Sequence, residues 1–172
     1  MSNTCFTRAH WYAVLVGTVL AALPVTAQIR KPATTTPCAL LPQSAIRLLL
    51  VPRGAKGVPD STGGTCTWGK IEDRRALVLT TFAGMTPDVI ERMRIGASKV
   101  SDPILEPTVA PGAWSTDKPF GRVFIASKGG NGLQLTYYTP PHSKGADRVD
   151  VRATNDDRLA LLEVAKVALA RF

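Results

Sequence analysis

The sequence predicts an α+β domain: an antiparallel sheet of about four to five strands with helices packed on one face and one disulfide. The order of elements is a short helix, two strands, a helix, two or three strands and a final helix. Strict β-α-β alternation, which would indicate a parallel sheet, is not visible. A glycine-rich turn between two alternating apolar stretches adds an antiparallel hairpin.

The first 27 residues have the pattern of an export signal. An uncharged apolar run, Trp11 to Leu23, follows a positively charged start and is too short to span a bilayer comfortably. Val25-Thr26-Ala27 then offers the small residues that a signal peptidase reads, so cleavage is expected before Gln28. An uncleaved membrane anchor is the alternative. Residues 28–36 are expected to form a flexible leader and residues 37–172 a single domain.

The cysteines point to a structural disulfide. Cys5 leaves with the signal, so Cys38 and Cys66 remain as a pair in an oxidising compartment. A redox pair would show C-x-x-C spacing, and two thiols with one histidine, His142, do not complete a tetrahedral metal site. No metal and no cofactor is therefore predicted.

The first half of the domain contains clear starts and stops. Pro42 suits the first position of a helix, and Pro52 ends it. Thr86 can cap a second helix that ends at Gly96. The elements expected here are a helix over 43–51, strands over 65–69 and 75–82, and a helix over 87–95.

The second half is expected to hold the hairpin and the last helix. Strands are predicted over 122–127 and 133–138, around the turn from Gly129 to Gly132. Residues 99–112 are interpreted as a long loop with room for one short edge strand, and 149–151 as a further short strand. Thr154 begins the final helix, which runs from about Asp157 to Arg171 with an apolar stripe.

The charge favours an anionic partner. Lys and Arg number 21 against 13 Asp and Glu, a net charge of +8, although the basic residues are scattered and solubility alone would also explain them. Our hypothesis is weak, salt-sensitive binding to an acidic cell-envelope component. The residues proposed to carry it are Arg74, Arg75, Arg122 and Lys128. Trp114 is either a partly exposed anchor or an ordinary core residue.

A resemblance follows from several short motifs together. Cys38-Ala39-Leu40-Leu41, Cys66-Thr67-Trp68, Gly112-Ala113-Trp114, a Lys-Gly-Gly hairpin and an Ala-rich C-terminal helix occur in one chain. In these features the chain resembles a family of small exported bacterial proteins, many of them lipoproteins, that is classed as a domain of unknown function. The resemblance implies a disulfide-linked α+β domain and supplies no catalytic residues. The chain lacks the lipobox of the lipoprotein members.

Catalytic motifs are weak throughout. His142 and Ser143 are adjacent in a loop without a nucleophile elbow, and the glycines after Lys128 join two strands, unlike a phosphate loop. We therefore predict a periplasmic or secreted, non-catalytic binding or accessory domain, with an envelope component or a partner protein as ligand and no nucleic acid. The alternatives are a small hydrolase with an unrecognised site, or a secreted inhibitor that uses the loop over 100–111.

Overall fold

A computed structural model describes residues 36–49, 51–139 and 154–172. The predicted signal peptide, the leader before Thr36, the strand over 149–151 and the loop with His142 lie outside the described residues. Among the residues described, no helix combines the length and apolar character needed to cross a bilayer.

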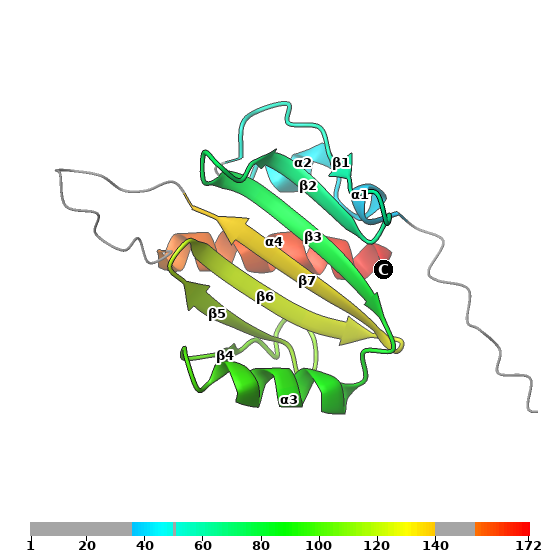
Figure 1. Cartoon of the computed structure of the whole chain (residues 1–172), viewed down its shortest axis with the longest axis vertical. Helices are drawn as coiled ribbons and strands as arrows, with labels where there is room; N and C mark the ends of the chain where they lie inside the picture. The colour runs from blue at the N-terminus through cyan, green and yellow to red at the C-terminus, as the bar shows by residue number, and fades with distance from the viewer. Residues whose placement is uncertain (1–35, 50, 140–153) are drawn as a thin grey trace, which may run out of the picture. The chain divides into compact units, whose positions relative to one another are not determined.

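The centre of the fold is one antiparallel sheet of seven strands, in the order β1-β2-β3-β7-β6-β5-β4 (Figure 1). The predicted antiparallel α+β class is confirmed, but the predicted number of four to five strands is too low. Two strands were not predicted: a two-residue edge strand at 58–59 and a strand at 114–118, where neighbours rather than local pattern create the pairing. The two-residue strand at 104–105 is the short edge strand for which the loop over 99–112 left room. The strands are β1 (Val58–Pro59), β2 (Thr65–Lys70), β3 (Arg75–Ala83), β4 (Ile104–Leu105), β5 (Trp114–Lys118), β6 (Gly121–Lys128) and β7 (Asn131–Tyr138).

The main core lies between the sheet and three helices. The long helix α4 (Asn155–Arg171) runs behind the sheet and across its strands, as Figure 1 shows, while the short helices α1 (Pro37–Leu40) and α2 (Gln43–Ile46) join the same core. Phe124 of β6 and Leu135 of β7 point into it. Val164 and Ala168 of α4, both fully buried, close it from the helix side.

Helix α3 (Pro87–Ala97) packs on the opposite face, so the prediction that all helices share one face is wrong. Ile90 of α3 lies in a second apolar cluster with Trp114, Val123 and Ile125. Val123 and Ile125 alternate along β6 with Phe124, and successive side chains of a strand point to opposite faces. The sheet therefore has apolar positions on both faces, which the order of elements does not reveal.

Helix caps and one tight turn are as the sequence predicts. Thr86 Oγ1 accepts a hydrogen bond from the Val89 amide, and Thr154 forms a capping box with Asp157. Gly129 and Gly130 both have positive φ and form a two-residue turn of the β6–β7 hairpin, at the predicted place but shorter than the predicted turn from Gly129 to Gly132. Two helix ends differ from prediction: α2 stops at Ile46, with turns following, and Gly96 lies inside α3.

Candidate functional site

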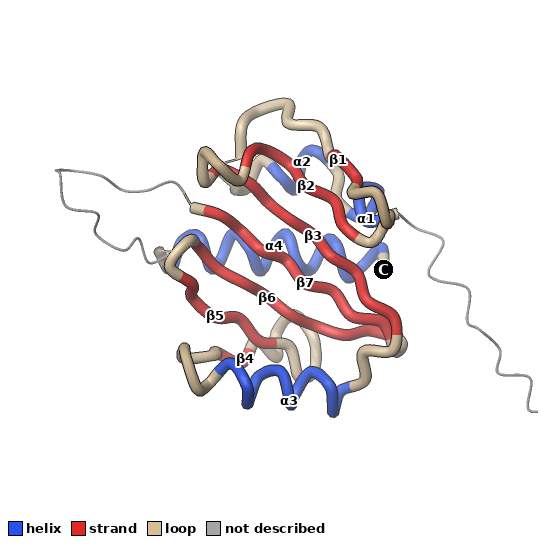
Figure 2. Tube along the Cα trace, viewed as in Figure 1, coloured by secondary structure: helices blue, strands red, loops and turns tan. Residues whose placement is uncertain are grey.

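A pocket of about 680 Å³ lies between the segment that follows α2 and the start of β3. This segment leads to the loop drawn in tan between α2 and β1 in Figure 2. The volume is within the range of about 300–1,000 Å³ that is usual for small-molecule sites. Half of its lining residues are basic, and the other half are apolar. The basic residues are Arg47, Arg53 and Arg75, and the apolar residues are Leu49, Val51 and Pro52.

The disulfide and a close backbone approach hold this part of the fold together. Cys38 and Cys66 are bonded, as predicted, and tie α1 to β2 with their Cα atoms 5.1 Å apart. The loop passes so close to β2 at Gly57 that a Cβ there would lie 2.7 Å from Cys66 Sγ and 2.8 Å from Trp68 Nε1. Only glycine fits at that point, so the disulfide and Trp68 fix the course of the loop.

The segment that forms the pocket wall has two buried residues between exposed ones. Leu49 and Val51 are buried in the main core and anchor the chain, whereas Arg47 and Arg53 on either side of them are exposed. Arg75, also exposed, is the first residue of β3 and pairs in register with Lys70 of β2. Local anchoring thus places three guanidinium groups around one pocket.

Among the residues that the structure describes, these three arginines form no ion pair. Within residues 36–49, 51–139 and 154–172, none of Arg47, Arg53 and Arg75 forms a hydrogen bond or an ion pair through its side chain. Glu72 and Asp73 are in the turn just before Arg75 but do not line the pocket. Like charges that face each other, as Lys70 and Arg75 do across β2 and β3, repel unless an anion lies between them.

The predicted basic residues do not form a single surface. Arg75 lines the pocket, and Arg74, exposed in the preceding turn with φ 49°, is its neighbour in the chain. Lys128 is at the other end of the strands: it pairs with Asn131, which pairs with Ala83 at the end of β3. At about 3.4 Å per residue this end is on the order of 25 Å from Arg75.

Two of the predicted binding residues have structural contacts instead. The Lys128 ammonium donates a hydrogen bond of 2.6 Å to the carbonyl oxygen of Leu169, in the last turn of α4, where positive charge is favourable. Arg122 is only 4% exposed and its guanidinium contacts Ser115 and Asp117. Arg122 is therefore not available to a ligand.

Trp114 is an ordinary core residue. It is 3% exposed and packs in the cluster under α3, and its indole N–H donates to the carbonyl oxygen of Ile90 at 3.3 Å. The structure thus selects the second of the two interpretations of this residue. The same residue begins β5, a strand that the sequence pattern did not reveal.

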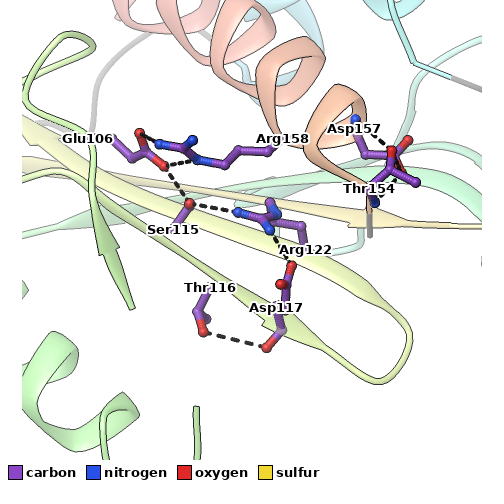
Figure 3. A network of polar contacts seen from close by, with 8 residues as sticks. All are labelled: Glu106, Ser115, Thr116, Asp117, Arg122, Thr154, Asp157 and Arg158. Atoms are coloured by element: carbon purple, nitrogen blue, oxygen red, sulfur yellow. Dashed lines mark hydrogen bonds and ion pairs between the residues drawn. The ribbon is translucent and has the colours of Figure 1, made fainter. Parts of the chain in front are cut away.

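A polar network links the β4–β5 edge of the sheet to α4 (Figure 3). Arg158 donates two hydrogen bonds, of 2.8 and 2.7 Å, to the two carboxylate oxygens of Glu106. Ser115 donates to Glu106 at 2.6 Å and accepts from Arg122 at 3.3 Å, and Arg122 pairs with Asp117. The bond to Glu106 raises the pKa of the Arg158 guanidinium. Two arginines and two carboxylates thus balance each other.

The centre of this network is closed to ligands. Glu106 is 2% exposed and Ser115 is fully buried, so the serine–carboxylate pair does not reach a substrate. Among the described residues, no group of three or more His, Cys, Asp or Glu side chains is placed to hold a metal ion. We therefore assign the network to the stability of the fold.

Arg47 and Arg53 were not among the predicted site residues. Neither is next to another basic residue, and both lie in a stretch interpreted as a helix and its following loop. The signal that could have found them is covalent: both lie inside the loop closed by Cys38 and Cys66, and β2 pairs with β3, which begins at Arg75. The disulfide ties this loop to β2, and the pairing of β2 with β3 places Arg75 on the neighbouring strand.

No protein-family model matches the chain, and no curated protein shows significant similarity to it.

Proposed function

We propose that the chain is an exported, non-catalytic domain that binds an anionic ligand in the pocket lined by Arg47, Arg53 and Arg75. The observation that carries the proposal is a set of three guanidinium groups around one pocket without an intramolecular partner in the described part of the chain. Planar guanidinium groups bind carboxylate and phosphate oxygens in a bidentate manner.

The disulfide supports the proposed location. A bond between Cys38 and Cys66 is compatible with an oxidising compartment, in which an exported protein resides. Periplasm and cell exterior both adjoin anionic polymers and lipids. A basic pocket in such surroundings serves a domain that recognises an acidic envelope component.

The test is retention on an immobilised phosphate matrix at rising salt. Arg47→Gln, Arg53→Gln and Arg75→Gln are combined in one variant, the pocket variant. The control variant removes the same amount of charge elsewhere, through Arg92→Gln, Lys99→Gln and Arg171→Gln, three exposed residues that do not line the pocket.

We expect the pocket variant to elute at distinctly lower salt than the control variant, because convergent charges bind an anion more strongly than scattered ones. Both should elute before the wild type, because each has three fewer positive charges to hold it on the anionic matrix against salt screening. Identical elution of the two variants would show that only net charge matters and would overturn the proposal.

A further inference from the structure

We infer that the ligand of this pocket is a phosphate monoester with an apolar body, bound with its phosphate on the arginines and its apolar part on Leu49, Val51 and Pro52. The inference rests on the proposed function and specifies the ligand class for the same pocket. It follows from the size of the pocket, the composition of its wall and the number of its positive charges.

The pocket is larger than an inorganic anion requires. A volume of about 680 Å³ is many times the roughly 30 Å³ that one water occupies in the liquid. A bare phosphate would leave most of that space to water. A ligand that fills the pocket therefore needs a body in addition to its charged group.

The residues that line the pocket indicate what kind of ligand body fits beside the phosphate. Besides the three arginines, the lining residues are Leu49, Val51 and Pro52, all apolar. Leu49 and Val51 are anchored in the core and only 5% and 7% exposed, so the fixed apolar surface at the pocket consists of exposed Pro52 and the accessible edges of these two side chains. Apolar ligand atoms placed there leave water at a gain of about 25 cal/mol for each Å². A sugar or another fully hydroxylated body would lack partners on this side.

The charges favour a phosphate over a carboxylate. A phosphate monoester carries about −1.5 to −2 charges at neutral pH and offers three acceptor oxygens. Three arginines line the pocket. A guanidinium group binds phosphate oxygens as a planar fork, so three of them can share the acceptor oxygens of one phosphate. A carboxylate has a single charge and two oxygens, so it would leave positive charge in the pocket without a counterpart.

Isothermal titration calorimetry with soluble probes tests the inference. The probes are inorganic phosphate, hexyl phosphate, hexanoate and hexanol, each titrated into the purified protein, the pocket variant and the control variant. Changing the ligand rather than Leu49 or Val51 avoids variants that fail to fold. Competition between hexyl phosphate and vesicles of phosphatidylcholine with phosphatidic acid then distinguishes a lipid headgroup from a soluble phosphate ester.

We expect hexyl phosphate to bind roughly tenfold more tightly than inorganic phosphate, the gain from burying about two methylene groups. Hexyl phosphate should also bind more tightly than hexanoate. The affinity of the pocket variant for hexyl phosphate should fall at least tenfold, while the control variant keeps its affinity. If the vesicles compete with hexyl phosphate, the phosphate belongs to a lipid headgroup. If they do not compete, the ligand is a soluble phosphate ester. Either result agrees with the inferred ligand class.

Three results would contradict these expectations. Equal binding of inorganic and hexyl phosphate, still lost in the pocket variant, would overturn the inference and leave the proposed function in place. Hexanol or hexanoate binding as tightly as hexyl phosphate would also overturn it. Equal binding of the probes to the pocket variant and the wild type would overturn both the inference and the proposed function.

Discussion

Arginines serve different purposes in two regions of this domain. At the β4–β5 edge, Arg122 and Arg158 contact buried or partly buried carboxylates and a serine. Around the pocket, Arg47, Arg53 and Arg75 have no such partner in the described residues. Burial of a charge requires a counter-charge, whereas exposed charges without one are available to a ligand. The comparison shows that some arginines of this chain stabilise the fold, whereas others have no partner among the described residues and are available to a ligand.

The largest effect is expected from the disulfide, which holds the pocket region. The variant with Cys38→Ser and Cys66→Ser should lose about 2–5 kcal/mol of the free energy of unfolding, because the unfolded chain regains the freedom of the closed loop. Urea unfolding of the variant and of the wild type measures this loss. Equal unfolding midpoints would contradict the structural role of the bond.

The next effect is expected from the buried network. Glu106→Gln should lower the free energy of unfolding by about 3 kcal/mol, because the substitution leaves Arg158 without its counter-charge at a mostly buried place. Glu91→Gln is the matched control, since Glu91 also accepts two hydrogen bonds from one arginine, Arg94, but at the surface. We expect no measurable change from the control.

The pH dependence of this effect follows from the direction of the shift. The hydrogen bond to Glu106 raises the pKa of Arg158. The stability that this contact adds to the fold is therefore fully present at every pH below the ordinary pKa of arginine. It is lost only as the pH rises through the raised value. The difference between the wild type and Arg158→Gln should therefore be constant from pH 6 to pH 9. A difference that disappears within this range would contradict the assigned contact.

The smallest effect on stability is expected at the pocket. Replacing Arg47, Arg53 and Arg75 by Gln should change the free energy of unfolding by no more than about 0.5 kcal/mol per site, because these exposed side chains contact no partner. Urea unfolding of the pocket variant checks this value. A loss comparable to that of Glu106→Gln would show that these arginines are structural after all.

The sequence predicted those features that depend on local chemistry. Proline and threonine mark the helix starts, and Gly129 and Gly130 mark the hairpin turn. The disulfide follows from the number of cysteines, because only Cys38 and Cys66 remain after the predicted signal. Each of these residues acts on its immediate neighbours or through a covalent bond. Such effects are visible in the sequence of a single chain.

The features that were missed depend on contacts between distant residues. Strand β5 contains a serine, a threonine, an aspartate and a lysine after Trp114, and becomes a strand because β4 and β6 pair with it. Arg122 looks like a surface residue until Ser115 and Asp117 are placed across from it. The pocket arginines are separated by up to 28 positions and meet only after β2 and β3 pair.

The central claim, that the pocket arginines are free to bind an anion whereas the network arginines are not, has a direct test. NMR spectra that resolve the side-chain Nε–Hε signals of arginine are recorded while inorganic phosphate is added. We predict that the signals of Arg47, Arg53 and Arg75 shift in a saturable manner while those of Arg122 and Arg158 stay in place. Equal, non-saturating shifts of the pocket arginines and of exposed Arg92 and Arg171 would contradict the claim.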